Sequence, residues 1–149
     1  MSFQSIDNFS RQVVKIMPQI YREFAKREHN ELTTGKISFP QIVTLVYVSR
    51  KSRVNMKCIA ANLGIKMSSA STLVDRLVRE KMLKRRRDEK DRRIVWIDIT
   101  SKGSKVINQI LRQKQRSIRE IFSVLTEKER DQYLDILKKV YLGHSDHEK

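Results

Sequence analysis

The chain has 149 residues, and its 32 Lys and Arg against 17 Asp and Glu give a formal net charge of +15. Hydrophobic residues make up 39% of the chain, with only 4 Gly and 2 Pro, a composition that argues against disorder and favours a helix-rich globular protein. The single cysteine excludes an internal disulfide and a cysteine-rich metal site.

The excess of positive charge predicts a polyanionic partner, either nucleic acid or an anionic membrane surface. No apolar run approaches the ~18 residues of a membrane span. The N-terminus, MSFQSIDNFSRQ, has no apolar core of the kind found in signal peptides. We therefore expect a cytoplasmic protein with no membrane partner.

The first predicted element is a helix over about residues 6–29. Its apolar residues recur every three or four positions, so they form one stripe on the helix: Ile6, Phe9, Val13, Ile16, Ile20 and Phe24. The segment ISFPQIVTLVYV predicts a second helix, in which Ser38 and Gln41 fit a capping box and Pro40 falls in the first turn.

Two helical patterns meet at Gly64, within the segment from Met56 to Leu83. A small residue at Ala60 lets two helices approach closely, and Gly64 permits a tight turn. Apolar residues follow one, six and nine positions beyond Gly64. This pattern favours a helix-turn-helix over an ordinary helical hairpin.

The second helix of this motif is predicted to begin near Met67 and to present polar residues outside the core. Short hydroxyls approach base edges and phosphates closely in the major groove, and an arginine reaches a phosphate or a guanine. Capping and solvation of the helix start is the alternative interpretation of the hydroxyls. The candidate DNA-binding residues here are Ser68, Ser69, Ser71, Thr72 and Arg76.

The run KRRRDEKDRRIVWIDIT, from Lys84 to Thr100, changes to the alternating pattern of a strand. LKRRR supplies a matching strand before the polar tip DEKD, and a hairpin directly after a helix-turn-helix is a wing. Its cations could line phosphates or enter the minor groove, whereas a merely solvated charged face is the alternative. The candidate DNA-binding residues of the wing are Lys84, Arg86, Lys90, Arg92 and Arg93.

The last third predicts two more helices, the first after an N-cap at Thr100 and the second after the capping box TEKE at residues 126–129. Their apolar stripe, together with that of residues 6–29, offers more apolar surface than a chain with a small central lobe could hide. A two-fold homodimer would bury it.

These segments resemble the MarR (multiple antibiotic resistance regulator) family of transcription factors. The matching pieces are ISFPQ, IAANLGIKMSSASTLVDRL, DEKDRRIVWIDITSKG and LTEKE. The most specific is Asp91-Arg92-Arg93, followed by the alternating strand, Thr100 and Gly103. The sequence departs from the family pattern at Lys66, where a Ser or Thr cap is usual, at Ala70, and at Lys81, where Gly is common.

The resemblance implies a mainly α fold with a small β hairpin, an α+β winged helix in a single MarR-type domain over residues 1–149. Its DNA-binding lobe would span about residues 37–100. The helices at about residues 1–30 and 101–143 would form the dimerisation region.

The resemblance also implies function: a sequence-specific regulator, expected to act as a repressor, that binds a pseudo-palindromic operator in double-stranded DNA as a homodimer. The recognition helix would enter the major groove and the wing arginines would lie at the minor groove, with Asp91 orienting Arg93. A sequence-neutral basic binder, architectural or RNA-binding, is the alternative. No enzyme is expected, because no nucleophile–base spacing and no phosphate-binding glycine motif is present. Neither a cofactor nor a metal is expected.

Some members of the family sense small aromatic effectors, and others oxidise a cysteine. Tyr21, Phe24 and Tyr47 are the candidate walls of an effector pocket, although core packing explains them equally well. Cys58 is interpreted as a small buried hydrophobe rather than a redox switch.

Overall fold

The computed structural model describes residues 5–30 and 32–145, and their contacts form two compact units. The central unit is Glu28–Lys114, and the terminal unit combines Met1–Arg27 with Gln115–Lys149. The central unit extends beyond the predicted lobe of residues 37–100 on both sides, because Val106, Ile107 and Ile110 are buried in its core.

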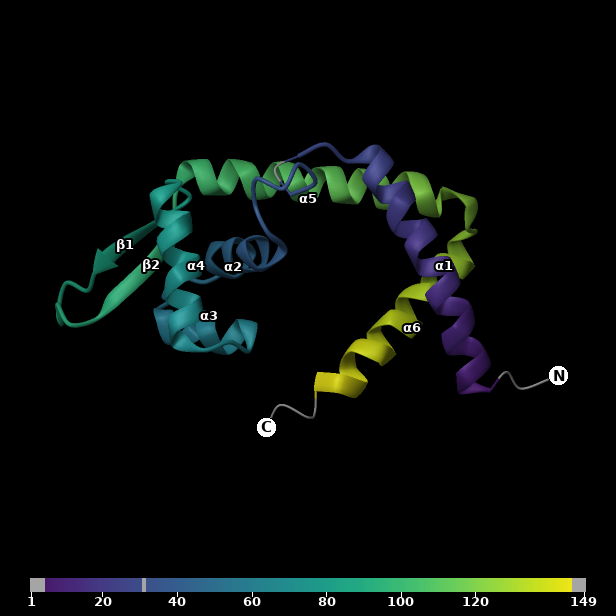
Figure 1. Ribbon diagram of the computed structural model, residues 1–149, viewed down its shortest axis with the longest axis horizontal. Coiled ribbons are helices and arrows are strands. Elements are labelled where there is room, and N and C mark those ends of the chain that lie inside the picture. The colour runs from purple at the N-terminus through teal and green to yellow at the C-terminus, as the bar shows by residue number, and fades with distance from the viewer. Residues whose placement is uncertain (1–4, 31, 146–149) are drawn as a thin grey trace. The chain divides into compact units, whose positions relative to one another are not determined.

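The central unit contains helices α2 (Phe39–Ser49), α3 (Met56–Leu63) and α4 (Met67–Arg79), the strands β1 (Leu83–Arg87) and β2 (Val95–Ile99), and the first part of α5 (Ser101–Ile121). One apolar core holds these elements together, and its most deeply buried members include Leu45, Ile59, Val74, Leu77, Leu83, Ile97 and Ile107. The predicted winged-helix fold class is confirmed (Figure 1).

The helix-turn-helix forms where the sequence predicted it. Asn55 caps α3 by accepting a hydrogen bond from the backbone N–H of Cys58 at 3.0 Å. The helix ends at Leu63, and the C-cap residue Gly64 has a φ of 63°, in the left-handed region. Helix α4 begins at Met67, and Lys66 makes no side-chain cap there. Ile65 lies in the turn itself and stays 36% exposed, so the apolar position directly after Gly64 does not join the core.

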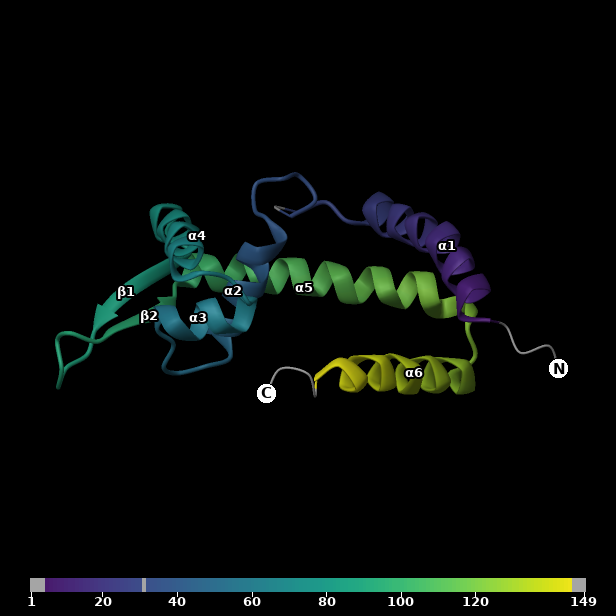
Figure 2. The ribbon, with the colours of Figure 1, turned by 60° about the horizontal axis from the view of Figure 1, so that its bottom comes forward.

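The predicted wing is an antiparallel hairpin in which Leu83 pairs with Ile99 and Arg87 pairs with Val95. The backbone N–H of Ile97 also donates to the carbonyl oxygen of Val54 at 2.7 Å, which fixes the other edge of β2. Only the base of the hairpin is buried, since Ile97 is 2% exposed and Val95 is 36% exposed. Figures 1 and 2 both show the rest of the hairpin extending beyond α3 and α4.

The base of the wing is closed by Thr100, the predicted N-cap of α5. Its hydroxyl donates to the carbonyl oxygen of Lys81 at 2.6 Å and accepts from the backbone N–H of Gly103 at 3.1 Å. An added Cβ at Gly103 would collide with the carbonyl oxygen of Met82, so this close approach requires glycine. Lys81 adopts a φ of 60°, which is the conformation that the Gly common at this position in the family would take without strain.

The terminal unit contains α1 (Ile6–Arg27), the end of α5, a 3₁₀ turn at Phe122–Val124, and α6 (Glu127–Ser145). Helix α1 therefore ends slightly before the predicted residue 29. The predicted capping box starts α6, since Thr126 N–H donates to Glu129 Oε2 at 2.8 Å and Glu129 N–H donates to Thr126 Oγ1 at 3.3 Å. The rings of Phe122 and Tyr133 stack with centroids 5.2 Å apart.

Much of the apolar surface of the terminal unit is left uncovered by the residues that the structure describes. Helix α1 is 22 residues long and buries none of its residues. Large apolar side chains stand exposed on both terminal helices, among them Ile6, Phe9, Ile16, Tyr21, Leu134, Ile136, Val140 and Leu142. None of the helices in the described part of the chain combines the length and the apolar character of a membrane span.

Candidate nucleic-acid interface

Helix α4 separates its apolar and polar residues onto two faces. Ala70, Val74 and Leu77 are buried in the core. Four of the predicted DNA-binding residues are exposed, namely Ser68, Ser69, Thr72 and Arg76, whereas the fifth, Ser71, is half-buried. A helix that buries one stripe and exposes short polar groups on the other can lie in a groove of DNA with those groups toward the bases.

Two side chains of this face already form hydrogen bonds, within α4 or to the residue that follows it. Thr72 Oγ1 donates to the carbonyl oxygen of Ser68 at 3.1 Å, and Arg76 Nε donates to Glu80 Oε1 at 3.1 Å. Arg76 is exposed and Glu80 is half-buried, so water still screens the Arg76–Glu80 ion pair from the Arg76 side and its strength is modest. The hydroxyls of Ser68 and Ser69 are the shortest polar groups on the exposed face.

At the tip of the wing, Asp91 holds Arg93 in place. The carboxylate accepts from the backbone N–H of Arg93 at 3.0 Å and from its guanidinium at 3.1 and 3.3 Å. The side-chain hydrogen bond from Arg93 lowers the pKa of Asp91 below its usual value. The Arg93 side chain is nevertheless 92% exposed, which leaves its remaining donors available.

The turn at the tip of the wing is held by Asp88, a role that the sequence did not predict. Asp88 Oδ1 accepts from the indole Nε1 of Trp96 at 2.8 Å, and its Oδ2 accepts from the backbone N–H groups of Lys90 and Asp91 at 2.9 and 3.1 Å. These bonds, the one from Trp96 first, lower the pKa of Asp88. An Asp followed by a turn is a known signal for this arrangement, but a sequence alone does not reveal the cross-strand partner Trp96.

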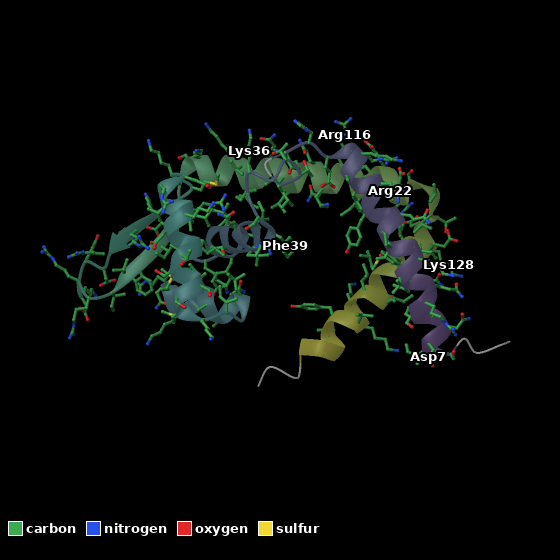
Figure 3. All side chains as sticks on the ribbon, in the orientation of Figure 1. Asp7, Arg22, Lys36, Phe39, Arg116 and Lys128 are labelled. Atoms are coloured by element: carbon green, nitrogen blue, oxygen red, sulfur yellow. The ribbon has the colours of Figure 1, made fainter. Side chains whose placement is uncertain are left out.

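The four cations of β1 differ in their surroundings. Arg86, a predicted DNA contact, is paired with Asp98 on β2 at 2.8 Å, and this hydrogen bond raises the pKa of Arg86. Arg85, which was not predicted, is paired with Asp75 and so ties the wing to α4. Within the part of the chain that the structure describes, Lys84 and Arg87 form no ion pair, and the same holds for Lys90 and Arg92 of the tip. Nitrogen-bearing side chains surround the hairpin (Figure 3).

The candidate effector residues divide between the two units. Tyr21 and Phe24 line a hollow of about 420 Å³ in the terminal unit, with Met17, Ile20, Ile118, Phe122, Arg130, Tyr133, Leu134 and Leu137. Tyr47 lines a different hollow, in the central unit, beside Phe39 and Arg50. The structure therefore brings two of the three residues together in one hollow.

Cys58, the single cysteine of the sequence, lies on α3. Cys58 is half-buried on α3 and packs against the core. Among the described residues, no group of His, Cys, Asp or Glu side chains could hold a metal ion.

Known proteins that are similar to this chain are transcriptional regulators. Residues 28–110, more than half of the chain, match the family described as "Transcriptional regulator SarA/Rot". The regulator YkoM of Bacillus subtilis is 26% identical over 147 residues, covering 94% of this chain and 95% of YkoM.

Solved structures share the fold at lower identity. A MarR family protein from Bacillus stearothermophilus has a TM-score of 0.78 and 20% identity, covering 97% of this chain and 99% of that one. S. aureus MepR bound to ethidium bromide has a TM-score of 0.67 and 23% identity, covering 91% of this chain and 95% of the MepR chain. The chain therefore belongs to the SarA/Rot family of transcriptional regulators, and it has the winged helix-turn-helix fold seen in a solved MarR family protein.

Proposed function

We propose that this regulator binds a specific, pseudo-palindromic operator in double-stranded DNA as a homodimer and represses transcription. One observation carries the proposal: the exposed polar face of α4 and the cationic wing belong to the same unit and are joined by the Arg85–Asp75 ion pair. A recognition helix tied to its wing can contact a major groove and the neighbouring minor groove together. The proposed site of action is the cytoplasm, where such DNA lies.

The proposed roles of the wing residues follow from their surroundings. Arg93, exposed and held by Asp91, would enter the minor groove, where a guanidinium is favoured by the strong negative potential of A/T-rich sequences. Arg92 would lie beside it. Lys84 and Lys90 would contact phosphates, and Arg86 would do so while bound to Asp98.

The uncovered apolar surface of the terminal unit supports the homodimer. Helix α1 buries no residue within the chain, and apolar stripes on α1 and α6 would cover each other across a two-fold axis. Such a dimer would set two recognition helices about 34–36 Å apart, or a multiple of that distance, to match two half-sites.

A sequence-neutral binder is the rival proposal, and the net charge of +15 favours it. The short hydroxyls Ser68 and Ser69 on α4 argue against it, since a purely electrostatic binder gains more from Lys or Arg there. A footprinting titration against excess mixed-sequence competitor DNA separates the two. We expect a protected site that persists under competitor, and loss of all protection would establish the sequence-neutral binder instead.

The hollow lined by Tyr21 and Phe24 is the proposed site of a small aromatic effector, in keeping with its apolar walls and the single cation Arg130. MepR, which has the same fold, is seen bound to ethidium bromide. We expect planar aromatic ligands to raise the melting temperature of the protein and to release it from its operator. The double variant Tyr21→Ala, Phe24→Ala should abolish both effects, and an unchanged ligand response in it would exclude this hollow.

A further inference from the structure

A second hollow, of about 490 Å³, lies in the central unit between the N-terminal end of α2 and the exposed face of α4. Its lining consists of Ser38, Pro40, Gln41, Ser69, Thr72, Leu73, Arg76 and Arg79. Three of these residues belong to the predicted DNA-reading face of α4. The hollow therefore opens beside that face.

One wall of the hollow contains a buried donor without an acceptor. Gln41 is 2% exposed, and its Oε1 accepts from the backbone N–H of Ser38 at 2.8 Å, which completes the start of α2. Its Nε2 is buried and has no hydrogen-bond partner among the described residues. Buried donors are nearly always paired in folded proteins, so this amide needs an acceptor, which water or a ligand in the hollow can supply.

The charges around the hollow specify that ligand. The N-terminal end of α2 carries the positive end of the helix dipole, and helix N-termini bind phosphate and other oxyanions. Arg76 and Arg79 bring two guanidinium groups, and none of the described residues that line the hollow is acidic. Arg76 also bonds Glu80, whereas no ion pair of Arg79 is found within the described part of the chain. The fitting ligand is an anion with several oxygen acceptors.

We propose that this hollow binds a phosphate group of the DNA backbone, with Gln41 Nε2 and the guanidinium of Arg79 as its donors. The inference rests on the proposed function, because it requires α4 to enter the major groove. That groove is about 12 Å wide, so the backbones that border it run along the sides of an inserted helix. A phosphate held between α2 and α4 would fix the angle of α4 in the groove without reading sequence.

Gln41→Glu tests the donor with little change of shape. The carboxylate keeps an oxygen for the N–H of Ser38, and Glu is a natural member of a capping box, but the N–H₂ donor is replaced by a negative charge. The matched control is Gln109→Glu, the same change at an exposed position of α5 that does not line the hollow. We expect Gln41→Glu to weaken binding about tenfold or more relative to the control, equally on operator and on mixed-sequence duplexes of the same length.

Arg79→Gln tests the cation, and because Arg79 is exposed this change leaves the core intact. Its control is Arg112→Gln, at another exposed position of the central unit. We expect Arg79→Gln alone to reduce the slope of log K against log salt by about one. This variant decides the matter if Gln41→Glu lowers the melting temperature so far that its binding cannot be compared.

The outcomes separate this inference from the proposed function. Equal binding by each variant and its control, with the operator still preferred by the wild type, would refute the phosphate site and leave the proposed function standing. Weakened binding by the variants, with no preference of the wild type for any sequence, would support the site and overturn sequence-specific regulation. Titration with inorganic phosphate, followed by the side-chain amide NMR signal of Gln41, identifies the remaining case. A shift at millimolar phosphate together with unchanged DNA binding would assign the hollow to a free anion and overturn the inference.

Discussion

At the wing tip, Asp88 and Asp91 together fix the position of Arg93. Asp88 closes the turn by accepting from the backbone of Lys90 and Asp91, and Asp91 then accepts from the backbone and guanidinium of Arg93. A side chain that is 92% exposed would otherwise sample many rotamers. Holding it in one geometry reduces the conformational entropy lost when it enters a groove.

We therefore expect Arg93→Ala to weaken operator binding by roughly 1–3 kcal/mol and to relax the preference at flanking A/T positions, as measured by binding to a panel of operator variants. Arg112→Ala, which removes an exposed cation from α5, is the control. Unchanged affinity and unchanged preference for Arg93→Ala would show that Arg93 belongs merely to a solvated face.

The bond between Asp88 and Trp96 gives the wing tip a defined response to acid. The folded state depresses the pKa of Asp88 below its ordinary value of 3.8, so its stabilising contribution is complete above 3.8 and is lost as pH falls through the lower, folded value. Trp96 is the only tryptophan, so its indole N–H signal in NMR reports this bond alone. We expect that signal to titrate with a midpoint below 3.8, and to lose this titration in Asp88→Asn. A midpoint at or above 3.8 would contradict the bond.

At the scale of elements, the junction between α4 and β1 carries a local strain. Lys81 has a φ of 60°, which costs an L-residue with a Cβ roughly 1–2 kcal/mol, whereas glycine adopts it freely. The neighbouring Thr100 hydroxyl bonds the carbonyl oxygen of Lys81 and keeps the junction in this conformation. The helix therefore stops at Arg79 and the chain turns directly into the wing.

Lys81→Gly should raise the free energy of unfolding by about 0.5–1 kcal/mol, because the relief of strain exceeds the added entropy of the unfolded chain. Urea denaturation measures the difference. Lys81→Ala removes the same charge and most of the same side chain but keeps the Cβ, so it should give no such gain. An equal gain in both variants would attribute the effect to charge and not to the backbone.

At the scale of the whole molecule, the two units differ in how far they bury their own apolar residues. The central unit has a closed apolar core of its own, and its element boundaries fall close to those predicted. The terminal unit leaves many large apolar side chains of α1 and α6 exposed, and exposed apolar patches mark interaction surfaces.

Ile16→Glu should therefore convert a dimer into a monomer, since Ile16 is 54% exposed within the single chain and a charge there is costly only when a partner covers it. Sedimentation at micromolar concentration measures the change, and Gln12→Glu, an exposed polar position on the same helix, is the control. A wild-type monomer with intact DNA binding would rule the dimer out.

The sequence by itself determined the features that depend on local conformation. Gly64 predicted the turn of the helix-turn-helix, and the alternation of residues after the wing tip predicted β2. Thr100 and Thr126 predicted the starts of α5 and α6. Each of these signals acts within a few residues, through an allowed φ, a period or a cap, so it can be read without knowing what lies across the fold.

Only the tertiary structure decided which polar groups meet. The pairs Arg85–Asp75, Arg86–Asp98 and Trp96–Asp88 join residues eight to twelve positions apart, and their formation depends on strand register and on how the wing leans on α4. The same holds for Gln41: the capping box predicted the bond of its Oε1, but not that its Nε2 would be buried without a hydrogen-bond partner among the described residues. Hydrogen bonds and burial at this range are set by the packing of whole elements, and a local pattern in the sequence does not encode them.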